Sequence, residues 1–121
     1  MADIGTYERS SLIASDRVEG TAVFDLKGER LGSISRLMIG KTSGQVDCAV
    51  LSFGGFLGIG NEHYPIPWSM LSYDVTKGGY AVDLDKDRLK DAPRYDLARE
   101  PEFDADYTRA LYSYYGVAPL F

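Results

Sequence analysis

Short runs of alternating apolar and polar residues dominate the first two thirds of the chain, between Leu12 and Leu84. They recur every 8 to 12 positions with turn residues between them, which is the spacing typical of a small β-barrel or sandwich. Strands are therefore predicted at residues 20–25, 31–40, 45–53 and 62–71, with a hairpin of two short strands within 73–84. The second half of the run 45–53 is apolar on both faces, so it is expected to be buried on both sides.

Glycine and proline mark the connections between these strands. Lys27-Gly28 and Lys77-Gly78-Gly79 have the composition of tight turns between antiparallel strands. Residues 54–60 form a glycine-rich connection. Pro65 and Pro67 cannot donate hydrogen bonds to a neighbouring strand, so they predict an edge strand or the rim of a barrel.

The pattern changes to a helical one towards the C-terminus. Asp85 is a suitable cap for a short helix at about 86–91, and the charged stretch 94–103 is typical of a linker. Asp104 then begins a helix at about 105–115, and Gly116 ends it. This helix is amphipathic, with its apolar stripe expected at helical spacing on Tyr107, Ala110, Leu111 and Tyr114.

These elements divide the chain into three parts. We expect a flexible tail at residues 1–10, a β-barrel domain at 11–92, and an extension at 93–121 that carries the amphipathic helix. The predicted fold class is mainly β: a small β-barrel with a short helix after the last strand and a C-terminal helix.

The composition excludes several classes of function but does not identify the function. The 121 residues include 13 Lys and Arg against 18 Asp and Glu, a net charge of -5, which disfavours binding to nucleic acid. The chain has one Cys and one His, so it offers neither a disulfide framework nor a Cys/His zinc site. No apolar segment is long enough to span a bilayer and no signal peptide is evident, so a cytoplasmic location is expected.

Two strings resemble ligand sites and fail in detail. The loop from Gly54 to Gly60 is rich in glycine, but neither a helix nor a lysine follows it as a phosphate site requires. The acids Asp83, Asp85 and Asp87 match the first half of a calcium loop, which then has Arg88 where glycine is needed and Arg94 where glutamate is needed. We therefore expect no catalytic, cofactor-binding or metal-binding residues, and no cofactor.

The single His63 and Cys48 fall on different predicted strands. A Cys-His hydrolase would need the two side chains within hydrogen-bond reach, which the sequence does not indicate. The simpler interpretation is a surface histidine and a buried thiol that packs as a small apolar group.

Two apolar surfaces are candidates for protein contacts. The first is the loop that carries Phe56, Leu57 and Ile59, and the second is the last helix with its tyrosines. That helix is expected to pack either onto the barrel or onto a second subunit, and a homodimer or larger closed oligomer would cover such a surface. The candidate interface residues are Phe56, Leu57, Ile59, Tyr107, Leu111, Tyr114 and Tyr115.

The strand of the form V-F-D followed by G-E-R-L-G-S-I, the glycine-rich loop, and P-I-P-W-x-x-L occur in an order that resembles the PRC-barrel domain family. The resemblance covers about residues 11 to 84. That family includes the cytoplasmic part of the H subunit of purple-bacterial photosynthetic reaction centres and the C-terminal domain of a ribosome maturation factor. Its motifs are structural, and the family pattern carries over no catalytic residue.

The resemblance implies a free-standing bacterial barrel that acts as a non-enzymatic adaptor or assembly module, binds an unidentified protein and associates with itself. An alternative is a peripheral component of the photosynthetic apparatus, which would involve peripheral association with a membrane. A ribosome or RNA maturation factor is less favoured because of the acidic charge. The sequence does not identify the partner, the oligomeric state or the role of the extension.

Overall fold

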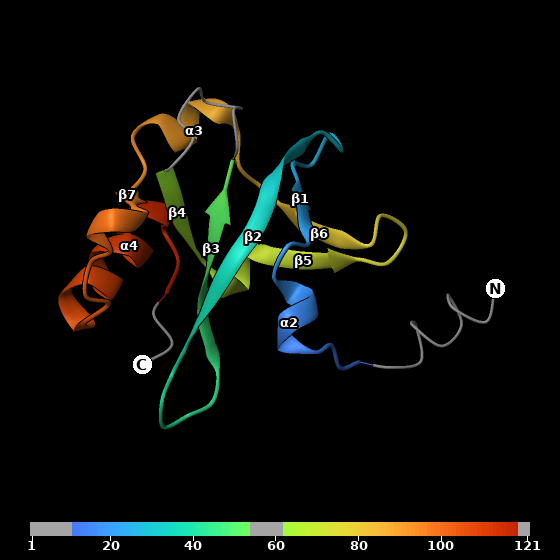
Figure 1. Cartoon of the computed structure of the whole chain (residues 1–121). Helices are drawn as coiled ribbons and strands as arrows, with labels where there is room; N and C mark the ends of the chain where they lie inside the picture. The colour runs from blue at the N-terminus through green and yellow to red at the C-terminus, as the bar shows by residue number, and fades with distance from the viewer. Residues whose placement is uncertain (1–10, 54–61, 119–121) are drawn as a thin grey trace.

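The computed structural model describes residues 11–53 and 62–118, and within them seven strands form one continuous sheet (Figure 1). The sheet order is β5-β6-β1-β2-β3-β4-β7, and its neighbouring strands are antiparallel except for the pair β1 and β6. The strands are β1 (Ala22–Phe24), β2 (Arg30–Ile39), β3 (Val46–Ser52), β4 (Glu62–Pro67), β5 (Leu71–Asp74), β6 (Gly79–Val82) and β7 (Tyr95–Asp96). The mainly-β class expected from the sequence is confirmed.

The long strand β2 bends the sheet. Its first residues pair with β1, and from Ser33 onward it pairs with β3. The register with β3 shifts between Ile34 and Arg36, and such a bulge increases the twist and bends the strand. At the bend a Cβ on Gly32 would lie 2.2 Å from the Ser52 carbonyl oxygen, so only glycine allows this close approach. The sheet therefore curls into the small barrel-like shape expected from the sequence.

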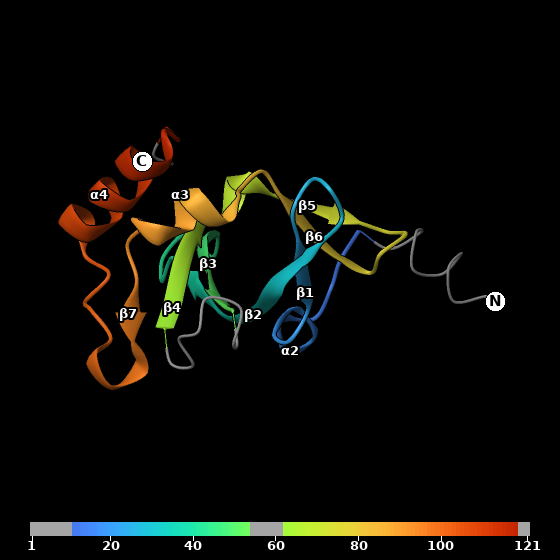
Figure 2. The same ribbon diagram turned by 90° about the horizontal axis from the view of Figure 1, so that it is seen from above.

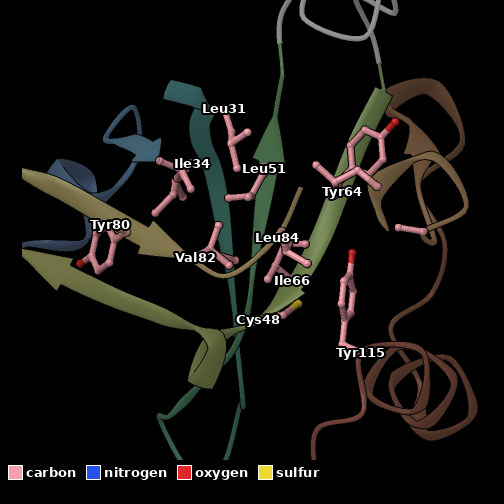
Figure 3. Packing of buried hydrophobic residues seen from close by; sticks show 14 of the residues in the cluster. Leu31, Ile34, Cys48, Leu51, Tyr64, Ile66, Tyr80, Val82, Leu84 and Tyr115 are labelled. Atoms are coloured by element: carbon pink, nitrogen blue, oxygen red, sulfur yellow. The ribbon is translucent and has the colours of Figure 1, made fainter. Parts of the chain in front are cut away.

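One apolar cluster fills the curl, and Figure 3 shows side chains from both halves of the sheet pointing into it. The four central residues of β3, from Cys48 to Leu51, are completely buried. This confirms that the second half of the run 45–53 is covered on both faces. Other members of the cluster are Leu31 and Ile34 of β2, Ile66 of β4, Val82 of β6, and Leu84.

The glycines of the predicted turns and the two prolines of β4 occupy positions that suit their backbone preferences. Gly28 and Gly78 have φ angles of +88° and +65°, in the left-handed region that glycine adopts without strain. In β4, strand β7 pairs only with Glu62 and His63, so the part with Pro65 and Pro67 has a strand neighbour only on the β3 side. The prolines thus occupy an edge-like position in the described sheet.

The described part of the chain contains five short helical segments beside the sheet: α2 (Ser15–Val18), α3 (Lys86–Lys90), α4 (Ala105–Tyr115) and the 3₁₀ turns η1 (Trp68–Met70) and η2 (Leu97–Arg99). The carboxylates of Asp85 and Asp104 accept hydrogen bonds from the backbone N–H groups of Arg88 and Tyr107, as N-caps do. Gly116 follows α4 with φ +68°, as expected for a helix C-terminus. Both predicted helices are therefore confirmed, together with their caps.

Two local expectations were wrong. Helix α2 lies in a stretch interpreted as β-type; the residue before it is Ala14, which provides no side-chain cap, so the sequence contains no start signal. The predicted linker 94–103 contains strand β7 and the turn η2. Tyr95 is only 6% exposed there, because β7 pairs with the end of β4.

The extension packs against the barrel. Helix α4 lies beside β4 at one end of the molecule (Figures 1 and 2). Its buried residues are Thr108, Leu111, Tyr112 and Tyr115. Ala110, which was expected in the apolar stripe, is exposed, and Tyr107 and Tyr114 are half-buried. The buried face is thus turned by one residue from the predicted stripe, because tertiary packing selects the side that carries Tyr112 and Tyr115.

Candidate functional site

A cleft of about 980 Å³ is lined by the β1–β2 turn and by helix α3 with the residues before it. The turn and α3 lie at the same end of the sheet (Figure 1). The turn contributes residues 25–27 and Glu29, and the chain from Asp83 to Arg88 contributes the opposite wall. Asp91 and Tyr114, the latter from α4, complete the lining. Three segments that are far apart in the sequence therefore form one depression, and the extension supplies part of its wall.

The lining of this cleft is acidic. Six carboxylates, those of Asp25, Glu29, Asp83, Asp85, Asp87 and Asp91, outnumber the three cations Lys27, Lys86 and Arg88. Two carboxylates serve the backbone: Asp25 accepts from the N–H groups of Lys27 and Glu29 in the turn, and Asp85 caps α3. The others face solvent along the rim. The cleft can therefore offer several carboxylates to a cationic group without first breaking buried contacts.

Arg88 and Tyr114 fix the wall at the side of α4. The Arg88 guanidinium donates to the Tyr114 carbonyl oxygen at 2.8 Å, and the Tyr114 hydroxyl donates to the Arg88 carbonyl oxygen. The guanidinium also lies over the rings of Tyr114 and Tyr115, at 5.3 and 5.6 Å from their centroids. These reciprocal contacts couple α3 to α4, which contributes Tyr114 to the lining of the cleft.

The acidic residues of the cleft are evident in the sequence, but their proximity in the fold is not. Asp83, Asp85 and Asp87 are evident as an acidic string, and Asp25 and Glu29 as acids flanking a glycine turn. The two sets meet because β1 and β6 are paired in parallel, with Phe24 opposite Ala81. A parallel pair brings the residues after both strands to the same edge of the sheet. Periodicity alone does not show which strands are neighbours.

The candidate interface residues on the last helix belong mainly to the core of their own chain. Leu111 and Tyr115 are 1% and 6% exposed, whereas Tyr107 and Tyr114 are half-buried. Of the two expectations for this helix, the structure shows it packed onto the barrel. The other interface candidates, Phe56, Leu57 and Ile59, lie outside the described residues.

Besides the contacts between Tyr114 and Arg88, a hydrogen bond from Tyr112 to the sheet and apolar packing hold the helix in place. The Tyr112 hydroxyl donates to Asp47, at 2.9 Å from the carbonyl oxygen and 3.1 Å from the carboxylate. Burial is the main reason that the pKa of Tyr112 is raised well above its ordinary value, and the Asp47 carboxylate adds to the effect. The hydroxyls of Tyr107 and Tyr115, by contrast, are buried and have no hydrogen-bond partner among the described residues.

His63 and Cys48 are not brought together. Cys48 is paired with Pro67 and His63 with Ser52, so the two positions are four residues apart along the β3–β4 ladder, or roughly 13 Å. His63 is 5% exposed and its ring stacks on Tyr95, so the expectation of a surface histidine was wrong. Cys48 is buried as expected, and burial raises the pKa of its thiol to about 12, which makes it a poor nucleophile at neutral pH.

Residues 11–53 and 62–118 contain neither a cluster of metal ligands nor a helix that could span a membrane. In that part of the chain no group of three or more His, Cys, Asp or Glu side chains is arranged to hold a metal ion. None of the helices described there has the length and apolar character needed to cross a bilayer.

Comparison with known proteins gives a family and a distant structural likeness. A family model described as the PRC-barrel domain matches residues 11–89, which is more than half of the chain. A solved structure from Pseudomonas aeruginosa, described as a 16S ribosomal RNA processing protein, RimM, superimposes with a TM-score of 0.46 and 22% sequence identity. The match covers 66% of this chain and 48% of that one, so the chain spans about half of its length. No curated protein matches the sequence.

Proposed function

Because the chain belongs to the PRC-barrel family, we propose that it is a non-enzymatic assembly module that binds a basic segment of a partner protein in the acidic cleft. The observation that carries the proposal is the cleft itself, with six carboxylates and three cations in its lining. A Lys- or Arg-rich segment complements this charge, and complementary charge guides association and selects the partner.

The cleft also offers apolar contact. Leu26, at the tip of the β1–β2 turn, is 68% exposed, and Tyr114 presents a half-buried ring on the opposite wall. Aromatic and apolar side chains provide much of the binding energy of protein interfaces, while the charged rim provides specificity. The partner segment is therefore expected to combine basic residues with at least one apolar side chain.

The same surface disfavours a role in RNA binding, since carboxylates along the rim repel a phosphate backbone. Membership of the photosynthetic membrane apparatus remains a prediction from the family resemblance, and the identity of the partner would test it. A cytoplasmic location likewise remains an expectation.

The test measures the binding of fluorescent peptides by anisotropy. A peptide of Lys, Arg and Leu should bind the protein, and the same peptide with Glu in place of its basic residues should not. Replacing Asp83 and Asp91 together by Asn should weaken binding about fivefold, because an exposed charge pair contributes roughly 0.5 kcal/mol. Higher salt should weaken the wild-type complex.

The matched control removes two acids from another surface. Asp16 and Glu19 are exposed on and beside α2, at the opposite end of β1 from the cleft (Figure 1). The double variant Asp16→Asn, Glu19→Gln has the same net charge as the cleft variant and should bind like the wild type. An equal loss in both variants would show attraction to the overall acidic charge, and would contradict a site in the cleft.

A further inference from the structure

Helix α4 is a peripheral element on an exposed connection. It lies at one end of the molecule and contacts the rest through one face (Figures 1 and 2). Between β7 and α4, residues 97–104 are exposed except for the half-buried Pro101 and Phe103. Eight residues can span roughly 27 Å when extended, whereas an 11-residue helix is only about 16 Å long. The connection is therefore long enough to carry α4 onto another molecule.

Two buried hydroxyl groups destabilise the docked state of α4. On the surface where α4 packs, the hydroxyls of Tyr107 and Tyr115 are buried and have no hydrogen-bond partner among residues 11–53 and 62–118. An unsatisfied buried polar group opposes docking. Both hydroxyls become hydrated when the helix leaves the surface on which it packs. Since the helix is short, it is marginal in water by itself, and its departure also exposes apolar residues of the sheet.

We propose that α4 exchanges between two copies of this chain, so that the helix of each copy packs on the sheet of the other, at the position where it packs within one chain. The exchanged helix makes the same apolar contacts through Leu111, Tyr112 and Tyr115 as it does within one chain. An exchange of identical elements keeps the contacts of α4, which makes it an accessible route to a symmetric dimer. Only contacts of the connection itself, such as the Arg36–Glu100 ion pair and the ring contact between Tyr95 and Phe103, have to rearrange. The apolar face of α4, which the sequence predicts as a surface for self-association, is then buried in both the monomer and the exchanged dimer.

The contacts that hold α4 become contacts between copies in this dimer. The Tyr112 hydroxyl donates to Asp47 of the second copy, and Arg88 binds Tyr114 of the second copy through their reciprocal hydrogen bonds. Each acidic cleft is then completed by Tyr114 of the other chain. This inference goes beyond the proposed binding of a basic segment, since either could hold without the other.

The primary test uses the full wild-type chain. Light scattering from micromolar to millimolar concentration should show a species of twice 13.4 kDa that increases with concentration. In a sample of ¹³C-labelled and unlabelled chains, mixed in denaturant and refolded together, NMR should detect nuclear Overhauser effects between Tyr112 of one chain and β3 of the other. A monomer at every concentration, or a dimer without these cross-chain effects, would overturn the exchange.

Connection length gives a second, independent readout. Deleting the exposed residues 97–99 should hinder α4 from folding back on its own chain and shift the protein towards the dimer. Inserting Gly-Ser-Gly between Glu100 and Pro101 is the matched control and should favour the monomer. A deletion variant that folds and remains monomeric would contradict the proposal, and if it does not fold, the wild-type experiment still decides.

Discussion

At the scale of the residue, three tyrosines on one helix show how differently the same side chain can contribute. All three lie on α4, but Tyr112 donates a hydrogen bond to Asp47, whereas the hydroxyls of Tyr107 and Tyr115 are buried and have no partner in the part of the chain that the structure describes. A buried hydroxyl stabilises the fold only if it is hydrogen-bonded; otherwise the loss of its hydration is a net cost. The contribution of each hydroxyl therefore depends on its partner and not on its burial.

Removing single hydroxyl groups tests this difference. Tyr112→Phe should lower the free energy of unfolding by about 1 kcal/mol, because it removes a hydrogen bond and keeps the ring. Tyr115→Phe should leave stability unchanged or raise it, because the lost hydroxyl had no partner. Urea denaturation of the two variants and the wild type measures both values. If Tyr115→Phe were as destabilising as Tyr112→Phe, its hydroxyl would have a partner after all.

Buried ionisable groups predict sensitivity to alkali. Burial raises the pKa of Cys48 from 9.0 and that of Tyr95 from 10.0, each to about 12, and Glu100 adds to the shift of Tyr95. Between pH 9 and 12 the unfolded chain loses these protons while the folded chain retains them. The free energy of unfolding should be unaffected below pH 9 and then fall, by up to about 1.4 kcal/mol per pH unit for each group.

Denaturation midpoints measured from pH 8 to 12 would show this fall. Cys48→Ala removes one of the ionising groups, so the variant should lose stability less steeply above pH 9, although it starts from a lower value. An equally steep fall in both proteins would exclude Cys48 as a source of the pH dependence.

At the scale of the element, the short helices depend on their caps. Helix α4 has 11 residues, begins with a hydrogen bond from the Tyr107 N–H group to the Asp104 carboxylate, and ends at Gly116 in a left-handed conformation. Helices of this length are marginal in isolation, so caps and packing together decide whether they form. Such helices can be predicted from the sequence when a capping residue marks each end. Helix α2 was not predicted, because no side chain caps its first turn.

Replacing the cap residue of α4 tests its contribution. Asp104→Ala should destabilise the protein by about 1 kcal/mol, since the first turn loses a hydrogen-bond acceptor. Asp104→Asn keeps an acceptor of nearly the same shape and should stay within a few tenths of a kcal/mol of the wild type. Thermal unfolding followed by circular dichroism measures both. Equal losses in the two variants would indicate that charge, and not capping, is what the helix needs.

At the scale of the whole molecule, the extension and the barrel share one core. Leu111, Tyr112 and Tyr115 of α4 belong to the same cluster of buried residues as the side chains of β2, β3 and β4. Figure 3 shows Tyr115 beside this cluster. The charged stretch between them indicated separate parts, but a polar connection does not prevent the elements on either side from packing together. Independent folding of residues 11–92 remains a prediction, now with an expected cost.

Truncation measures that cost. A fragment of residues 11–92 loses four large buried side chains, those of Tyr95, Leu111, Tyr112 and Tyr115. Each is worth about 2 kcal/mol of apolar burial, so the unfolding free energy of the fragment should fall by several kcal/mol. The control is residues 11–121, which lacks only the first ten residues. Urea denaturation compares the two. Equal stability would mean that α4 contributes nothing to the core, contrary to the burial of these residues.

Local chemistry by itself determined the approximate positions of β1 to β6, the turns at Gly28 and Gly78, and both capped helices, but not β7 or the end of β4 at Pro67. These features depend on backbone preferences and on periodicity within a few residues, so the sequence displays them directly. Only the tertiary structure decided that His63 is buried against Tyr95, that α4 turns Tyr112 and Tyr115 inward, and that acids from two distant segments line one cleft. Those outcomes depend on which strands become neighbours, and strand pairing is set by the packing of the whole chain.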